Sequence, residues 1–318
     1  MNNNNNMKSK TISVVMCTYN GEKFIRKQLD FILRQTLPAD EIIIQDDCST
    51  DNTYNILTEY QKKYPTMQVY RNSQNMGIKP NFFNAIFKTT SDYIAIANQD
   101  DIWEDYNLEL QAKCIGDRLL CGDRSIPFST TKKEVRIDMR IPNYNLLRWL
   151  FIGSISGHTV LFSRKLLQKM PSISKINQIR LYDAILGIVA AAVDSIIYIE
   201  KNLEHHRIHD SCATYSTPTD NAMTFKNIYK YIIRTWELHK KLKPEIPKRL
   251  LATHSFLSQT ESKKPILEDV KRMIEYIPIQ LECFCIRHYN LLFFSKVKKP
   301  IGILRAIYFP FSLSEYYR

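Results

Sequence analysis

The sequence is poor in glycine and contains none of the glycine-rich motifs that bind phosphate. Only 8 of its 318 residues are glycine. The loop after the first predicted strand contains a single one, Gly21, where a dinucleotide-binding motif has Gly-x-Gly-x-x-Gly. No Gly-Lys-Ser/Thr sequence follows a glycine-rich turn, so a P-loop is excluded too. Any phosphate group must therefore be held by other means.

Long apolar runs and paired cysteine motifs are also missing. No uncharged apolar run reaches about 18 residues, which argues against a membrane-spanning helix. The seven cysteines include no Cys-x-x-Cys pair, and their odd number favours reduced thiols in a cytosolic protein. Cys283 and Cys285 are too close together for a zinc site, so we interpret them as small apolar residues on a helix. We expect the polar residues 1–10 to be a disordered start, not a signal peptide.

Composition and charge indicate a globular protein with a basic end. Hydrophobic residues make up 44% and charged residues 24%, and the length favours a larger domain followed by a smaller one. Most of the net charge of +12 falls in residues 218–318. A basic region beside a nearly neutral one suggests an acidic partner, either anionic lipid or nucleic acid.

Strand and helix patterns alternate over the first hundred residues. Apolar, β-branched runs predict strands at 11–18, 41–45, 67–71 and 93–97. Helical periodicity predicts a helix that begins at residue 24 and is stopped by Pro38, and further helices at 53–64 and 80–88. This alternation predicts an α/β protein with a mostly parallel sheet flanked by helices. Beyond residue 105 the pattern weakens, with a strand at 159–162, a helix at 181–193 and a strand at 195–199. From residue 218 a helical stripe, clearest at 225–236, predicts an all-helical C-terminal region.

Polar clusters follow three of the predicted strands, at the edge of the sheet where ligands bind in such folds. Each cluster alone is equally well explained by turn and capping residues. Two of them, however, contain adjacent acids: Asp46 with Asp47, and Asp100 with Asp101. Paired carboxylates repel one another unless a cation or a donor-rich ligand compensates them. Their oxygen ligands suit Mg²⁺ or Mn²⁺ bound together with substrate phosphates.

Residues 14–22, 42–51 and 98–103 carry three motifs whose order and spacing resemble glycosyltransferase family 2, above all its bacterial rhamnosyltransferase-like members. The resemblance covers about residues 11–215. It implies the GT-A fold, a nucleotide-sugar donor and a divalent metal ion, Mn²⁺ or Mg²⁺. It places a catalytic domain at residues 11–217 and leaves 218–318 as a basic helical region.

The resemblance also implies roles for individual residues. The nucleotide would be bordered by Thr18, Tyr19, Asn20, Glu22, Asp46, Asp47 and Asn98. Within that set Asp47 would contact the base. Asp100 would be the principal metal ligand, supported by Asp101. Close relatives have aspartate where this chain has Asn98, which can donate or accept a hydrogen bond but brings no charge.

The remaining implied residues lie further along the chain. Asp183 matches the family's catalytic aspartate and would be the general base of an inverting displacement, although an ordinary helix cap is the alternative. Gly157 and His158 would lie on the acceptor side. Arg207 and His209 would approach the diphosphate as cation and as donor or metal ligand.

We therefore predict an inverting glycosyltransferase of cell-surface polysaccharide synthesis. It would use a UDP- or dTDP-sugar, with rhamnose favoured by the motifs, and a glycan or lipid-linked acceptor at the cytoplasmic membrane face. A catalytically silent nucleotide-sugar-binding scaffold and a peripheral membrane adaptor are the alternatives. The lysines, arginine and aromatic residues of 293–311 fit either an interfacial helical region or a solvated face. Nucleic-acid binding is disfavoured, because no recognised motif accompanies the charge.

Overall fold

The computed structural model describes residues 10–129, 141–151, 153, 155–170, 182–209 and 245–258, with the isolated residues 135, 268, 271, 286 and 287. The predicted helical stripe at 225–236, Cys283 and Cys285, and most of the basic C-terminal region lie outside the described residues. One helix, α9 (Glu245–Leu257), is described in that region. The predicted boundary after residue 217 stays a prediction.

The first half of the sheet is the parallel unit that the sequence predicts. Its strands are β1 (Ile12–Thr18), β2 (Glu41–Asp46), β3 (Met67–Arg71) and β4 (Tyr93–Ala97). They are connected by α1 (Ile25–Leu33), α2 (Thr53–Lys63) and α3 (Ile78–Ile86). β1 pairs in parallel with β2 and with β4, and β2 pairs in parallel with β3. The carboxyl ends of all four strands therefore point the same way.

The second half of the sheet is mixed. Its elements are β5 (Ile102–Trp103), α4 (Asn107–Ile115), β6 (Leu120–Phe128), α5 (Leu146–Phe151), a 3₁₀ turn (Gly157–Thr159), β7 (Val160–Ser163), α6 (Arg164–Gln168), α7 (Tyr182–Ala192) and β8 (Ile196–Arg207). β7 runs antiparallel to β4 and β6, β6 runs parallel to β8, and β5 runs antiparallel to β8. The strand order is β3-β2-β1-β4-β7-β6-β8-β5. The prediction of an α/β sheet flanked by helices is confirmed, with antiparallel strands completing its parallel half.

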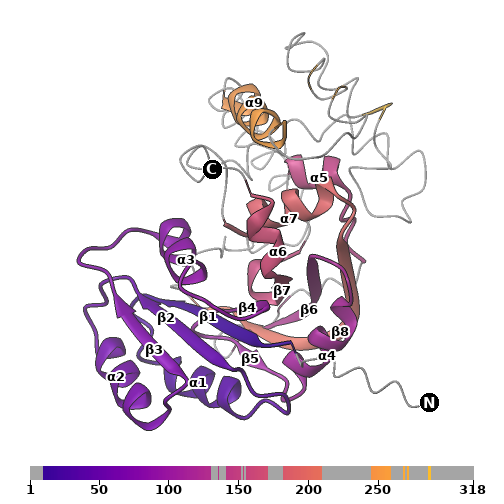
Figure 1. The fold of residues 1–318 in the computed structure, drawn as a ribbon. Coiled ribbons are helices and arrows are strands. Elements are labelled where there is room, and N and C mark those ends of the chain that lie inside the picture. Colours follow the sequence, from indigo (N-terminus) through magenta and orange to yellow (C-terminus); the bar gives the residue numbers. More distant parts are fainter. Residues whose placement is uncertain are drawn as a thin grey trace, which may run out of the picture.

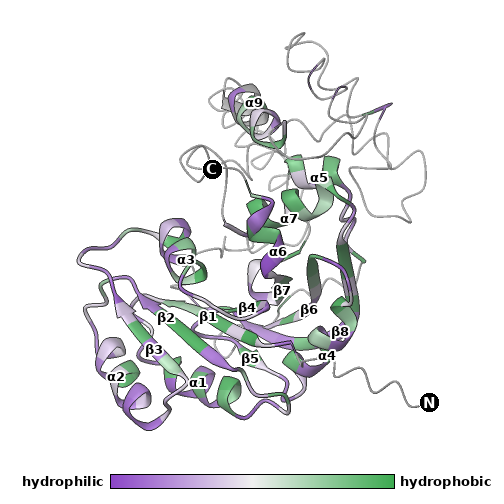
Figure 2. Cartoon of the chain, viewed as in Figure 1, coloured by the Kyte–Doolittle hydropathy of each residue, from purple (hydrophilic) through white to green (hydrophobic). Residues whose placement is uncertain are grey.

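Helices cover both faces of this sheet (Figure 1). Alternate residues of β1 point to opposite faces: Val14 packs in a core with α1, α2 and α4, whereas Val15 packs in a core with α3, α5 and α7. In Figure 2 α7 is almost wholly hydrophobic, and every one of its residues except Asp183 is buried. An apolar helix of this kind belongs in the interior. Among the helices that the structure describes, none is both long and apolar enough to cross a bilayer.

Candidate active site

A cavity of about 530 Å³ opens at the carboxyl ends of β1, β2 and β4, where the sequence places its polar clusters. Eight of the predicted site residues line it: Thr18, Tyr19, Asp47, Asn98, Asp100, Gly157, His158 and Asp183. The six others are not part of its lining: Asn20, Glu22, Asp46, Asp101, Arg207 and His209. The fold thus brings residues from both halves of the sheet to one hollow.

Asp47 holds the loop of residues 72–77 against the cavity through three hydrogen bonds. One carboxylate oxygen accepts hydrogen bonds from Asn72 Nδ2 (2.7 Å) and the Met76 N–H (2.8 Å), and the other accepts from the Gly77 N–H (2.9 Å). The side chain is buried, yet Asp47 and Gly77 both line the cavity. Asp47, which the sequence predicts to contact the nucleotide base, therefore also holds this loop in place at the cavity.

Asp46 points away from the cavity. It is fully buried and accepts hydrogen bonds from Thr18 Oγ1 and the Ser49 N–H, each at 3.0 Å, and Arg71 Nε lies 3.4 Å from its Oδ2. These partners join β1 and β3 to the turn after β2. The two adjacent acids consequently have different environments, and Asp46 acts as a brace for the strand ends.

Asn20 and Glu22 connect the loop after β1 to the loop after β2. Asn20 has a left-handed backbone (φ 50°), which asparagine tolerates better than most residues, and its Oδ1 accepts the Thr50 N–H at 2.8 Å. Glu22 Oε2 accepts the Asn52 N–H at 3.0 Å. Both side chains organise the loops in this structure and do not line the cavity.

The second acid pair is surrounded by histidines from the end of β8. His209 Nε2 lies 2.7 Å from Asp100 Oδ2, and His206 Nδ1 lies 3.0 Å from Asp101 Oδ1. The Asn98 amide donates to Asp101 Oδ2 at 2.9 Å. Asn98 therefore compensates the pair by donating a hydrogen bond, which an aspartate at this position would not do when ionised.

The two acids differ in their electrostatics. Burial, followed by the like charge of Asp101, raises the pKa of Asp100. For Asp101 burial acts in the same direction, but the hydrogen bond from His206 and the nearby His158 outweigh it and lower the pKa. For His206 burial acts to lower the pKa, yet its contact with Asp101 outweighs burial and raises it. A cation beside Asp100 would relieve its unfavourable charge.

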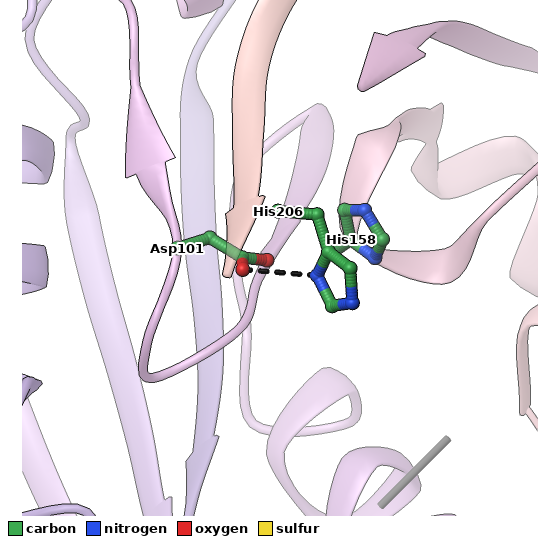
Figure 3. Close-up of side chains that lie close together, drawn as sticks. All are labelled: Asp101, His158 and His206. Carbon is green, nitrogen blue, oxygen red and sulfur yellow. Dashed lines mark hydrogen bonds and ion pairs between the residues drawn. The ribbon is translucent and has the colours of Figure 1, made fainter. Parts of the chain in front are cut away.

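Asp101, His158 and His206 form a compact group, shown in Figure 3, with one potential ligand atom from each lying within 4.8 Å of the others. The rings of His158 and His206 are stacked, with centroids 4.7 Å apart. Burial lowers the pKa of His158 to about 4, so its imidazole is neutral near pH 7 and able to ligate a metal. A carboxylate beside two imidazoles suits a divalent transition metal such as Mn²⁺ better than Mg²⁺, which prefers oxygen ligands.

Arg207 donates one hydrogen bond to each member of the acid pair. Its Nε donates to the Asp100 carbonyl at 2.8 Å, and its backbone N–H donates to Asp101 Oδ1 at 2.9 Å. The guanidinium lies over the rings of Phe24 (4.8 Å) and Phe128 (4.6 Å). The side chain predicted to approach the diphosphate is thus buried under the segment that would bind it.

Asp183 lies in the first turn of α7 and lines the same cavity as Asp100. Its Oδ1 accepts the N–H of the next residue, Ala184, at 2.8 Å, which ties the carboxylate to the first turn of the helix. Gly157 allows this helix end to approach closely. A Cβ atom added to Gly157 would lie 2.5 Å from the Tyr182 hydroxyl oxygen and 2.9 Å from Asp183 Cβ. The role of Gly157 is therefore to leave space for Tyr182 and Asp183.

Glu204 and Asp123 carry two buried carboxyl groups that lie near each other. Glu204 Oε1 is 3.5 Å from His158 Nε2, and neither Glu204 oxygen has a hydrogen-bond partner. Asp123 Oδ2 accepts from Gln111, whereas its Oδ1 has no partner. Burial, and then the neighbouring carboxyl of Asp123, raises the pKa of Glu204 well above its ordinary range. Burial also raises the pKa of Asp123.

Several cavity residues escaped the sequence analysis. They are Cys17, Asn75, Gly77, Ile78, Asn81, Phe82, Gln99, Ser156, Tyr182 and His206. For Asn75 and Gly77, the signal available in the sequence was the Asn75-Met76-Gly77 turn before an apolar helix. Tyr182 was hidden because its stacking on Phe82, with ring centroids 4.0 Å apart, joins distant segments.

The fold and the site define an α/β protein with a cavity at the carboxyl ends of its parallel strands, and comparison with known proteins specifies its family. The family model described as "Glycosyl transferase family 2" matches residues 13–170, and the chain belongs to this family. The dTDP-rhamnosyl transferase RfbG of Shigella flexneri is 39% identical over 105 residues, covering 31% of this chain and 36% of RfbG. The putative teichuronic acid biosynthesis glycosyltransferase TuaG of Bacillus subtilis is 33% identical over 107 residues, covering 34% of this chain and 42% of TuaG. The matches span less than half of either relative.

The solved structures show that the likeness includes the fold. S. aureus TarS 1–349 in complex with UDP-GlcNAc has a TM-score of 0.55 at 17% identity, covering 97% of this chain and 91% of TarS 1–349. GalNAc-T7 with UDP, GalNAc and Mn²⁺ has a TM-score of 0.51 at 13% identity, covering 64% of this chain and 45% of GalNAc-T7. The chain therefore has the GT-A fold of these glycosyltransferases.

Proposed function

We propose that this protein is an inverting glycosyltransferase that moves a sugar from a nucleoside diphosphate to a hydroxyl group of a growing cell-surface glycan. One observation carries the proposal: Asp47, Asp100 and Asp183, from three separate segments of the chain, line a single cavity. A nucleotide binder needs only the first two. A transfer reaction needs in addition a carboxylate that accepts the proton of the acceptor hydroxyl, and Asp183 would be that carboxylate.

The donor would lie along the edge of the sheet. Its base would occupy the side of Asp47 and Tyr19, and its diphosphate the side of Asp100. A divalent ion, held by Asp101, His158 and His206 beside Asp100, would supply positive charge that stabilises the departing diphosphate. Because Asp100 is partly buried beside the buried Asp101, the two acids suit the binding of such a cation.

Asp183 would be the general base. It would accept the proton of the acceptor hydroxyl as that oxygen attacks the anomeric carbon from the face opposite the diphosphate, so configuration inverts. The space left by Gly157 allows Asp183 to reach the cavity. The Asp183 carboxylate accepts a hydrogen bond from the Ala184 N–H, and this bond fixes its orientation.

The donor and the acceptor are proposed from the chemistry of the relatives. RfbG is named a dTDP-rhamnosyl transferase, TarS is seen with UDP-GlcNAc, and TuaG is named for teichuronic acid synthesis. We propose a dTDP- or UDP-sugar donor, with rhamnose first among the sugars, and a glycan or lipid-linked acceptor at the cytoplasmic face of the membrane.

A thermal-shift screen of UDP- and dTDP-sugars, with and without Mn²⁺, tests the donor. A ligand that binds only the folded state raises its stability. We expect one donor to raise the melting temperature with Mn²⁺ and to be hydrolysed slowly by the wild-type protein. Asp100→Ala should abolish the metal-dependent hydrolysis. A donor that binds but is neither hydrolysed nor transferred would favour a silent nucleotide-sugar-binding scaffold.

A further inference from the structure

Gln99 makes a two-point contact with the backbone of Tyr19. Its side-chain Oε1 accepts the Tyr19 N–H at 2.9 Å, and its Nε2 donates to the Tyr19 carbonyl oxygen at 3.1 Å. The amide thereby pairs with both backbone polar groups of one residue, as a neighbouring strand would. We call this pair of hydrogen bonds the Gln99 clamp.

Gly21 provides the space that the clamp occupies. A Cβ atom added there would lie 2.4 Å from Gln99 Oε1 and 3.2 Å from Gln99 Nε2. The three nearest atoms all belong to the far end of the Gln99 side chain. An alanine at position 21 would therefore push the Gln99 amide out of place and leave the surrounding backbone undisturbed.

The clamp completes the support of the loop after β1. On the side away from the cavity, the second loop holds it: the Asn20 N–H donates to Ser49 Oγ at 3.0 Å, and the Gly21 N–H donates to Thr53 Oγ1 at 2.8 Å. On the cavity side, Gln99 supplies the hydrogen bonds. Tyr19 and Gln99 themselves both line the cavity.

The clamp joins two parts of the proposed donor site. Tyr19 would lie on the base side, and Gln99 directly precedes Asp100, which would lie on the diphosphate side; all three line the cavity. We propose that Gln99 is a positioning residue for the donor: its clamp fixes the distance between the two loops that a nucleoside diphosphate must bridge. This inference rests on the proposed function, because it assumes that the cavity binds such a donor.

The expected effect is on binding more than on chemistry. A loop that is already ordered loses less conformational freedom when the ligand binds, so preorganisation strengthens affinity. Without the clamp, part of the interaction with the nucleotide is used to order residues 19–21. The KM for the donor should rise, whereas kcat should change little because Asp183 and the acid pair are untouched.

Two variants remove the clamp by independent routes. Gln99→Met keeps the side-chain length and deletes both hydrogen bonds, and Gly21→Ala displaces an intact Gln99. We expect each to weaken the binding of UDP or dTDP with Mn²⁺ by about tenfold, as loss of two hydrogen bonds implies. The double variant should be no weaker than either single one, because both remove the same contact. Gln61→Met is the matched control, since Gln61 accepts the Val69 N–H far from the cavity.

Amide hydrogen exchange tests the clamp without any ligand. The Tyr19 N–H should exchange faster in Gln99→Met and Gly21→Ala than in the wild type or Gln61→Met. Wild-type affinity in both clamp variants, or strictly additive losses in the double variant, would overturn the inference. If the wild type binds no nucleotide although Tyr19 is protected, the proposed function fails and the inference fails with it.

Discussion

The two halves of the sheet solve the problem of buried charge in different ways. In the parallel half the buried carboxylate of Asp46 accepts hydrogen bonds from Thr18 and Ser49. In the mixed half both oxygens of Glu204 and one of Asp123 lie buried without a hydrogen-bond partner. The pairing of β6 with β8 also shifts register twice between Asp123 and Ser125, whereas β1 pairs regularly with both neighbours.

This difference suggests a division of labour. The regular half supplies a rigid wall for the nucleotide, whose binding requires fixed loops and satisfied polar groups. The irregular half supplies His158, Asp183 and His206, the groups to which we assign chemistry. Local rules of stability are commonly broken at functional sites, where the surrounding structure compensates. The comparison can be tested by changing equivalent groups in the two halves.

The largest effect should come from Asp183, because the division of labour assigns the reaction to the mixed half. Asp183→Asn keeps the shape but removes the proton acceptor, so we expect transfer to fall by about a thousandfold. Donor affinity, measured by calorimetry, should stay near the wild-type value. Asp194→Asn, just after the other end of α7, is the control and should retain full activity. Substantial transfer by Asp183→Asn would remove Asp183 from the mechanism.

A smaller effect should follow from changing one fully buried acid in each half. Asp101→Asn removes a charge from the group with His158 and His206, and we expect at least about a tenfold loss of Mn²⁺ affinity by electron paramagnetic resonance titration. Asp46→Asn disturbs only Thr18, Ser49 and Arg71. It should lower the melting temperature and leave Mn²⁺ affinity unchanged. Equal losses of Mn²⁺ affinity in both variants would contradict the assignment of metal binding to the mixed half alone.

The parallel half was predictable because its residues obey local rules. β3 and β4 begin and end where the β-branched and apolar runs predict, and β1 and β2 differ by one residue. The mixed half was harder. Only the first four residues of β6 are buried, and its later residues Arg124 and Ser125 do not alternate as a strand pattern requires. Such a strand forms because β8 pairs with it, which is a tertiary effect.

The candidate site shows the same limit. Motif resemblance placed Asp47, Asp100 and Asp183, which do line one cavity. It could not separate Asp46 from Asp47, because the direction of each side chain depends on its position in β2. Nor could it find Glu204, since a glutamate in a polar run is normally exposed. Its burial follows from the pairing of β8 with β5 and β6.

The smallest effect should be on stability, and it concerns Glu204. Its pKa lies above the ordinary value of 4.5, so between those two pKa values the folded protein holds a proton that the unfolded chain releases. Stability must then fall as the pH rises through this window. Glu204→Gln cannot ionise and escapes that loss, so its advantage over wild type should grow from about pH 5 to about pH 8 and reach at least about 1 kcal/mol. Glu200→Gln, an exposed site on the same strand, should show no such trend. Urea unfolding across this pH range measures both, and a pH-independent difference for Glu204→Gln would mean that Glu204 is ionised in the folded protein.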